Sequence, residues 1–243
     1  MRISIIIPCY NAEQFIEQSV ESAINQSYQD KEIIVIDNES LDNSYDKIKN
    51  LKNKYPQIIV GTAPNLYRHS WTEPVEEALS LSSGEYFTIV GSDDYLDKNY
   101  IQNIADVINK SNGKIQIFQS PICGVNENNL PINNGSISHT YKNLSEFKQR
   151  LLTGCPVNTP TVVYKKSLHD EGDIFWDSES FLGSADYNLY FHLADKKKFI
   201  YPIPKWLGYH YRWHLGQATW GMQKEETRYD EKIKSYWRKK WKT

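Results

Sequence analysis

The sequence predicts an α/β fold with an open, mostly parallel sheet and helices on both faces. Three observations predict it. The first half of the 243-residue chain alternates strand-like and helix-like segments. Its strand-like segments, such as Ile3 to Ile7, are almost continuously apolar and β-branched, which is typical of parallel strands buried on both faces. Short polar clusters follow several of these strands, at the edge where open parallel sheets bind ligands.

The first 118 residues carry the regular alternation. After the strand at 3–7, Asn11 is placed to cap a helix over 12–26, in which apolar residues recur at helical spacing. A second strand follows at 32–36 and ends at Asp37. The other elements expected here are helices at 44–54, 73–82 (stopped by Gly84) and 100–109, and strands at 58–60, 85–90 and 115–118.

The pattern loosens from about Pro121. Residues 126–138 are rich in Asn, Gly and Ser and predict a loop or hairpin. Helices are expected at 144–152 and 186–195, with a short strand at 161–164. Because clean alternation is lacking, we expect this half to extend the same sheet, so that residues 1–243 form one domain.

Composition narrows the class of protein. The formal net charge of −2 does not favour a nucleic-acid partner. Three cysteines, Cys9, Cys123 and Cys155, have no metal-ligand spacing, and their odd number favours a reduced, cytoplasmic compartment over a disulfide framework. The apolar run before Pro8 is too short for a signal peptide, and no stretch is long enough to cross a bilayer. We therefore expect a soluble protein, or one attached to a membrane surface.

Two adjacent acids, Asp93 and Asp94, end the fourth predicted strand and are the most informative feature of the chain. Neighbouring carboxylates repel each other, and a hard divalent cation that carries a diphosphate would stabilise them. The alternative is a solvated loop start or helix cap. The clusters Pro8-Cys9-Tyr10 and Asp37-Asn38 also follow strands, so all three are expected at one edge of the sheet.

Four segments together carry a family resemblance. SIIIPCYNAEQFIEQSVESAINQSYQDKEIIVIDNES, SSGEYFTIVGSDDYLD, FWDSESFLGSADYNLYFHL and YHYRWH resemble family 2 glycosyltransferases over most of the chain. The resemblance implies a GT-A fold and an inverting transfer from a nucleotide-sugar, with UDP as the nucleotide, to a glycan or lipid-linked acceptor in surface polysaccharide biosynthesis. It divides the single domain into a nucleotide-sugar-binding half at 1–118, an acceptor-binding half at 119–224 and a basic tail at 225–243.

The resemblance also implies which residues hold the donor diphosphate. Asp94 matches the metal-binding aspartate, and Asp93 lies beside it near the ribose or a metal-bound water. His214 is placed to complete the shell of a Mn²⁺ or Mg²⁺ ion, although a single His is often only structural. Arg212 would meet the diphosphate as a fixed fork of donors.

Nucleotide recognition is implied at the first two strand ends. Tyr10 matches an aromatic that stacks on the base, with Pro8 shaping the turn; ordinary packing is the alternative for Tyr10. Asp37 and Asn38 stand where the family has two aspartates that read the base and ribose. Asn38 is a departure, because its carbonyl accepts a hydrogen bond but carries no charge.

Further departures surround these positions. Glu39 replaces a usual glycine, and Gly91 stands where many relatives have another aspartate. At the positions of an Arg and an Asn that face the nucleotide in many members, this chain has Trp71 and Glu76. Arg68 or His69 are the candidates to replace the missing contact.

On the acceptor side, Asp186 matches the general base. A carboxylate is a weak base at its ordinary pKa, and burial near the acceptor would raise that pKa. Asp186 is also placed to cap the helix that follows, and the two roles are compatible. Glu179 is the other candidate base, and Trp176 is the aromatic expected to contact a sugar, with core packing as its alternative.

The tail at 225–243 predicts a basic helix with Tyr229, Ile233, Trp237 and Trp241 on one stripe. One interpretation is peripheral contact with the inner face of an anionic membrane, and the other is a helix packed on its own domain.

Two other functions remain open. A sugar-nucleotide pyrophosphorylase would have a Gly-rich phosphate loop after the first strand, where this chain has Asn11-Ala12-Glu13. A non-catalytic nucleotide- or glycan-binding module on the same scaffold is the second alternative, favoured by the departures above.

Overall fold

The computed structural model describes residues 1–217 and 228–242. Its first-half elements are β1 (Ile3–Cys9), α1 (Ile16–Ile24), β2 (Lys31–Asp37), α2 (Ser44–Lys54), β3 (Ile59–Thr62), α3 (Thr72–Leu81), β4 (Tyr86–Ile89), β5 (Tyr95–Leu96), α4 (Tyr100–Lys110) and β6 (Ile117–Gln119). They are followed by β7 (Ile122–Val125), β8 (Pro131–Ile137), α5 (Leu144–Leu151), the 3₁₀ turn η1 (Thr159–Thr161), β9 (Val163–Lys165), α6 (Ser167–Asp170), α7 (Ser178–Phe181), the 3₁₀ turn η2 (Leu182–Ser184), α8 (Ala185–Asp195), β10 (Tyr201–Pro202), β11 (Tyr209–Arg212) and α10 (Tyr229–Trp241).

A seven-stranded sheet in the order β10-β6-β9-β4-β1-β2-β3 forms the centre of the molecule. Strands β1 to β4 are parallel, and β9 runs antiparallel to both β4 and β6. Cys9 pairs with Asp37, so the ends of β1 and β2 lie level with each other. The predicted α/β class is therefore confirmed, and the strands of the second half extend the sheet of the first.

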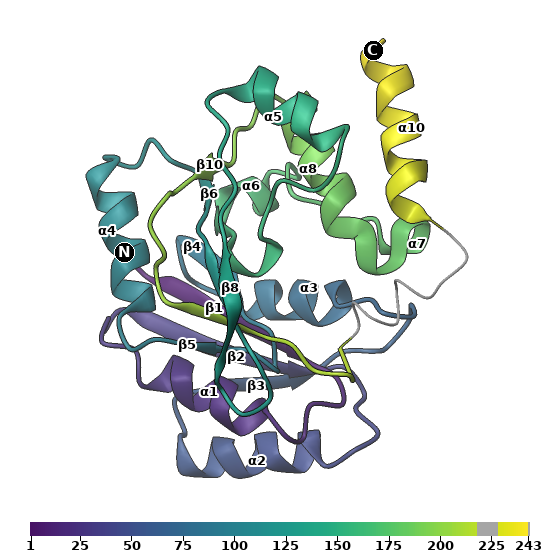
Figure 1. Cartoon of the computed structure of the whole chain (residues 1–243). Helices are drawn as coiled ribbons and strands as arrows, with labels where there is room; N and C mark the ends of the chain where they lie inside the picture. The colour runs from purple at the N-terminus through teal and green to yellow at the C-terminus, as the bar shows by residue number, and fades with distance from the viewer. Residues whose placement is uncertain (218–227, 243) are drawn as a thin grey trace.

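Successive side chains along the strands point to opposite faces of the sheet and belong to two separate hydrophobic cores. Ile3, Ile5 and Ile7 pack with residues of α1, α2 and α4 on one face. Ile6 faces the other side, where α3, α5 and α8 contribute. The helices accordingly cover both faces of the sheet (Figure 1). This near-complete burial explains why β1 and β2 are apolar almost throughout.

A smaller sheet has the strand order β5-β11-β7-β8 and lies next to the carboxyl end of β4. β5 begins directly after the Asp93-Asp94 pair and pairs antiparallel with β11, near the end of the chain. β7 and β8 form the hairpin that was expected within 126–138. The pairing of β5 with β11 brings residues 209–214 to the acidic pair, across more than a hundred positions of sequence.

The first helix departs from its expected start. Asn11 is not an N-cap: it has φ of +48° and its Oδ1 accepts from the Leu41 backbone N–H at 2.7 Å. α1 begins at Ile16, because the loop before it is held by side chains of the next loop. Ser44 Oγ accepts from the N–H of Ala12 at 2.8 Å, for example. The two loops at the ends of β1 and β2 are thus locked together.

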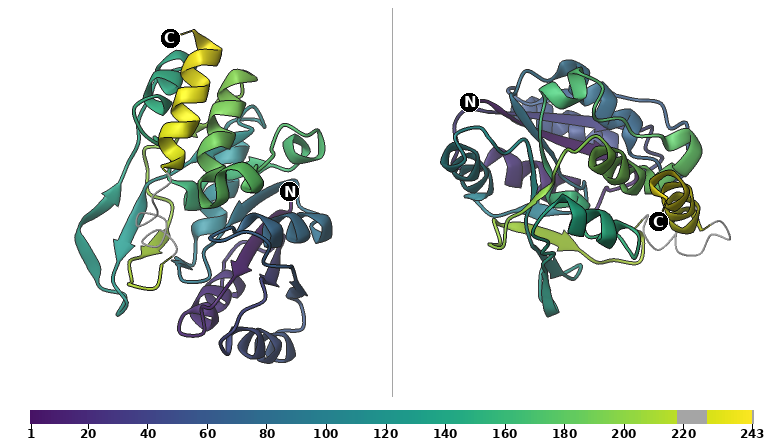
Figure 2. Two further views of the ribbon diagram at one scale, coloured as in Figure 1. Left: turned by 90° about the vertical axis from the view of Figure 1, so that its right-hand side faces the viewer. Right: turned by 90° about the horizontal axis from the view of Figure 1, so that it is seen from above.

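The C-terminal helix α10 packs along α8 (Figure 2). Ile233 and Trp237 are buried, and Trp237 stacks on Phe191 with ring centroids 5.7 Å apart. Trp237 Nε1 donates to Asn188 Oδ1, and Trp241 Nε1 donates to Asp195 Oδ1. The stripe expected from the sequence exists, but it faces the protein and not a membrane.

Candidate active site

A cavity of about 730 Å³ opens at the carboxyl ends of β1, β2 and β4. The three polar clusters singled out in the sequence meet there, with contributions from the loop before α3, from η1 and from the segment after β11. Its lining includes Pro8, Tyr10, Asn38, Arg68, His69, Trp71, Asp93, Asp94, Thr159 and His214. Segments distant in sequence therefore share one cavity, as expected for an open parallel sheet.

Asp93 and His214 form the polar pair on the donor side of this cavity. His214 Nε2 lies 2.9 Å from Asp93 Oδ2, and the side chains are 15% and 26% exposed. The His214 ring packs on Phe15 with centroids 4.9 Å apart. Asp93 and His214 thus both line the cavity, and packing on Phe15 holds the His214 ring in place. A carboxylate and an imidazole in this arrangement suit a divalent cation such as Mn²⁺.

Asp94 also lines the cavity but is more deeply buried than Asp93. Its side chain is only 2% exposed, and both carboxylate oxygens are occupied. Oδ2 accepts from Tyr209 OH at 2.6 Å, and Oδ1 accepts from the Arg212 N–H at 2.8 Å. Burial, with repulsion from Asp93 second, raises the pKa of Asp94 well above its ordinary value. Asp94 therefore fastens β11 to the end of β4, and Asp93 is the carboxylate that faces outward.

Gly91 explains how two acids fit at this turn. A Cβ atom at position 91 would lie 2.6 Å from Asp94 Oδ2 and 2.8 Å from Asp93 Oδ1. The Gly91 N–H also donates to Tyr209 OH at 3.1 Å, which places that hydroxyl between residues 91 and 94. The close approach of the two carboxylates therefore favours a residue without a side chain at this position.

Arg212 does not lie among the residues that line the cavity. It is 1% exposed, and its Nε donates to the Asp93 carbonyl at 2.6 Å. Its terminal nitrogens donate to Gln18 Oε1 and Asn129 Oδ1, both at 2.8 Å. The guanidinium also lies over the Phe15 ring at 4.5 Å. In this structure the donors of Arg212 hold loops together, and its contact with a diphosphate stays a prediction.

The nucleotide-side residues lie at the ends of β1 and β2. Pro8 and Tyr10 line the cavity, and Tyr10 is 45% exposed, so its ring is available for stacking. Asn38 lines it too, and turning its amide over lets the nitrogen donate to the carbonyls of Ala63 and Pro64 at 3.3 and 3.0 Å. Asp37 is buried beside the cavity: Oδ2 accepts from the Ser40 N–H, and Oδ1 has no partner among the described residues.

The other departures also have local explanations. Glu39 has φ of +56°, the left-handed region that favours glycine, which accounts for a usual glycine there. Glu76 points away from the nucleotide side and pairs with His169 at 2.9 Å. Trp71, Arg68 and His69 all line the cavity.

Asp186 lies in the first turn of α8 and reaches the cavity through one neighbour. Its Oδ2 accepts from Thr159 Oγ1 at 2.6 Å, and Thr159 lines the cavity. Its Oδ1 accepts from the Tyr187 N–H at 2.7 Å. Burial raises the pKa of Asp186 from 3.8 to about 6, against the lowering effect of these hydrogen bonds. A carboxylate with this pKa is suited to accept a proton near neutral pH. The cap residue of α8 is Ser184.

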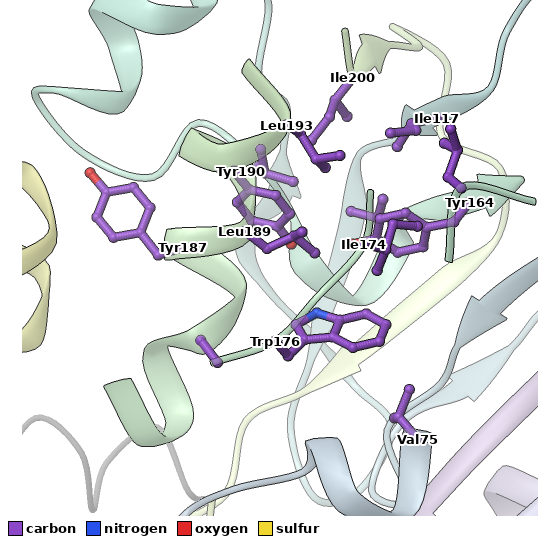
Figure 3. Close-up of a cluster of buried hydrophobic side chains, with 14 of the residues drawn as sticks. Val75, Ile117, Tyr164, Ile174, Trp176, Tyr187, Leu189, Tyr190, Leu193 and Ile200 are labelled. Carbon is purple, nitrogen blue, oxygen red and sulfur yellow. The ribbon is translucent and has the colours of Figure 1, made fainter. Parts of the chain in front are cut away.

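The two other acceptor-side candidates do not line the cavity. Trp176 is 5% exposed and lies in the core (Figure 3), and it packs edge-on to Trp71 with centroids 5.7 Å apart. Of these two tryptophans, Trp71 is the one that lines the cavity. Glu179 is exposed on α7 and is not among the described residues that line the cavity. Thr159 was missed, because a Thr-Pro-Thr turn carries no local signal of a site.

The sheet order and the cavity at its carboxyl edge define a GT-A fold. Residues 4–171 match the model of glycosyl transferase family 2. The chain belongs to this family.

Similar proteins place the fold more closely. The chain is 26% identical over 208 residues to a poly(ribitol-phosphate) beta-glucosyltransferase of Bacillus spizizenii, covering 79% of this chain and 32% of that protein. It is 25% identical over 192 residues to the poly(ribitol-phosphate) beta-N-acetylglucosaminyltransferase TarS of Staphylococcus aureus, covering 78% and 32%. The chain thus spans about a third of the length of these relatives. The structure of S. aureus TarS 1–349 in complex with UDP-GlcNAc superposes with a TM-score of 0.72 at 20% identity, over 93% of this chain and 62% of that one.

Proposed function

We propose that this chain is the catalytic unit of an inverting glycosyltransferase. It moves a sugar from a UDP-sugar to a glycan or lipid-linked acceptor in surface polysaccharide biosynthesis. The observation that carries the proposal is the single cavity that Asp93, His214 and Tyr10 share with Thr159, the hydrogen-bond partner of Asp186. The residues expected to hold the donor and the hydrogen-bond partner of the base thus border the same space.

The proposed reaction is one in-line displacement. The acceptor oxygen attacks the anomeric carbon while Asp186 takes the acceptor proton. The bond between that carbon and the diphosphate breaks, and the diphosphate leaves with the electron pair. Attack opposite to the leaving group inverts the configuration. The rigid placement of Asp186 by Thr159 and the Tyr187 N–H serves the alignment that this step needs.

The residues present fit a Mn²⁺ or Mg²⁺ ion. Asp93 and His214 offer one carboxylate oxygen and one imidazole nitrogen on the cavity wall. The described residues hold no cluster of three or more potential protein ligands. Such cations commonly take one or two protein ligands and complete their shell with substrate phosphates and water. When bound, the ion would offset charge on the departing diphosphate.

The nucleotide assignment rests on Tyr10 and Asn38. An exposed tyrosine ring and a neutral amide suit stacking and hydrogen bonding to a uracil, which offers both donor and acceptor groups. The complex of the superposed TarS structure with UDP-GlcNAc supports UDP. The names of the relatives support a glycan or polyol-phosphate acceptor for surface polymers.

The test is release of UDP from a panel of UDP-sugars, with and without Mn²⁺. We expect one UDP-sugar to bind by calorimetry and to release UDP only when the cation is present. Tight binding with no release, even with candidate acceptors, would favour a non-catalytic module. Consumption that requires inorganic pyrophosphate would identify a pyrophosphorylase. Failure to bind any nucleotide-sugar contradicts the proposal.

We further propose that the protein is cytoplasmic and contacts the inner membrane face through the basic ends of α8 and α10. No helix among the described residues is long and apolar enough to span a bilayer. Because α8 and α10 run parallel, Lys197 at the end of α8 lies at the same end as Lys239 and Lys242 of α10. These exposed lysines suit anionic lipid headgroups.

Charge reversal tests this contact better than deletion of the tail, which would uncover Phe191. We expect Lys239→Glu/Lys242→Glu to weaken binding to phosphatidylglycerol vesicles, measured by flotation, by about thirtyfold or more, since each basic residue contributes about 1 kcal/mol. The matched control is Lys110→Glu/Lys114→Glu at the exposed end of α4. Equal flotation of both variants, or flotation with neutral vesicles, contradicts the contact.

A further inference from the structure

A chain of hydrogen bonds lies behind Asp186. Tyr190 OH donates to Thr159 Oγ1 at 3.0 Å, and Thr159 Oγ1 donates to Asp186 Oδ2 at 2.6 Å. Since a threonine hydroxyl carries one hydrogen, accepting from Tyr190 directs that hydrogen toward Asp186. Tyr190 is fully buried on α8, the helix that also carries Asp186 (Figure 3).

The chain crosses from one element to another. Thr159 belongs to η1, whose position is fixed separately: Thr161 Oγ1 donates to the Ser120 carbonyl at 2.8 Å. Tyr190 and Asp186 stand four residues apart, on the same side of α8. The hydroxyl of Thr159 therefore ties a carboxylate on a helix to a turn that lines the cavity.

The carboxylate is held by these contacts in one orientation. Oδ1 accepts from the Tyr187 N–H and Oδ2 from Thr159, so two of roughly four acceptor positions are used. The short contact to Thr159 is a hydrogen bond to a charged group, the stronger kind. It favours the ionised carboxylate, which is the form that accepts a proton.

We propose that Thr159 and Tyr190 are positioning residues of the transfer reaction, in which Tyr190 orients the Thr159 hydroxyl and that hydroxyl aims the Asp186 carboxylate and keeps it ionised. This rests on the proposed function, with Asp186 as the base. Neither residue exchanges a proton with substrate. Thr159 acts through Asp186, and Tyr190 acts through Thr159.

Among the other titratable groups around Asp186, one carboxylate opposes its ionisation and the rest are neutral. Asp230 on α10 repels it and raises its pKa, after the larger effect of burial. Cys155, Tyr164 and Tyr190 are neutral neighbours whose own pKa values are raised, mainly by burial. Removal of the Thr159 hydroxyl leaves burial and Asp230 less opposed, so the pKa of Asp186 rises further.

The experiment compares pH profiles of kcat/KM for UDP-sugar-dependent transfer. Thr159→Val keeps the shape of the side chain but removes the hydroxyl. We expect its kcat/KM at pH 7 to fall about tenfold or more, and the acidic limb to move upward by about one pH unit. The loss should be smaller at pH 9, where the base is ionised in both proteins. Thr159→Ser should restore the profile.

Tyr190→Phe should give a smaller change in the same direction, and none when added to Thr159→Val, because its effect passes through that hydroxyl. The matched control is Tyr86→Phe, which removes the hydroxyl of a buried tyrosine in the other core that donates to the Ile115 carbonyl instead. We expect its acidic limb to be unchanged.

A second readout does not depend on activity. The ¹³C carboxyl titration of Asp186, assigned by comparison with Asp186→Asn, should move upward in Thr159→Val and not in Tyr86→Phe. An unchanged titration and pH profile in a folded Thr159→Val protein overturns the inference while transfer by the wild type remains. Wild-type protein with no transfer at all would instead contradict the proposed function, and the titration would still decide the hydrogen-bond chain.

Discussion

Replacement of Asp186 by asparagine is expected to lower kcat by about a thousandfold, with little change in donor affinity. A positioned general base contributes about 10²- to 10⁴-fold, and an amide cannot take the acceptor proton. Donor affinity should be kept, because Asp186 contacts the cavity only through Thr159. The wild-type rate should rise with pH around 6, where the carboxyl loses its proton.

The same substitution should not weaken the fold. The pKa of Asp186 is raised from 3.8 to about 6, so the folded state binds this proton more tightly than the unfolded state does. Ionisation of Asp186 therefore costs stability, a cost that grows between pH 3.8 and about 6 and is fully present above. The uncharged amide of the Asp186→Asn protein avoids that cost but can accept from only one of the two donors to Asp186, so the two effects offset and we expect its Tm at pH 7 to change little.

Steady-state kinetics, calorimetric titration with the UDP-sugar and thermal melts check these expectations together. The matched control is Glu179→Gln, which neutralises the exposed acid on α7 and should leave kcat as in the wild type. Near-normal turnover by Asp186→Asn, or a large loss in Glu179→Gln, would show that another group is the base.

Replacing Asp93 by asparagine should weaken donor binding, whereas replacing its neighbour Asp94 should lower the thermal stability of the fold. Asp93 faces the cavity and His214, so Asp93→Asn should weaken Mn²⁺-dependent donor binding by about 100-fold, since loss of even an outer-shell partner of a metal ligand costs 10- to 100-fold. Asp94 is buried with both oxygens hydrogen-bonded. The amide of asparagine has one oxygen and can accept from only one of the two donors, Tyr209 OH and the Arg212 N–H. The other donor is left without an acceptor, so Asp94→Asn should lower the Tm by about 5 °C.

Titration of Mn²⁺ and UDP-sugar into both variants, with melts of the free proteins, separates the two roles. We expect normal melting for Asp93→Asn and retained cation-dependent binding for Asp94→Asn at temperatures below its Tm. Loss of cation dependence in a fully stable Asp94→Asn protein, with Asp93→Asn binding as the wild type does, would reverse the assignment.

The fold was largely predictable from local sequence. Buried parallel strands demand continuous apolar runs, and the helices between them carry one apolar stripe, so the order of elements in 1–118 follows from the local pattern. The start of α1 was not predictable. Asn11 looks like a cap, but Ser44 and its neighbours on the next loop bind the backbone that a cap would bind. A contact across some thirty residues leaves no trace in the local pattern.

The site was predictable only in part, for a related reason. Strand ends locate the cavity, which is how Tyr10, Asn38 and the acidic pair were found. Which acid of a neighbouring pair faces outward depends on Tyr209, a residue of the distant strand β11. Arg212 and Trp176 have side chains suited to a ligand, yet tertiary packing uses them to fill the interior.

The most direct measurement is a crystal structure of the Asp186→Asn protein with the preferred UDP-sugar and Mn²⁺. The account predicts the uracil ring against Tyr10 and Asn38, and the diphosphate beside Asp93 and His214. It predicts that the sugar is directed toward Thr159 and residue 186. A donor bound outside this cavity, or a sugar separated from residue 186 by protein, would contradict it.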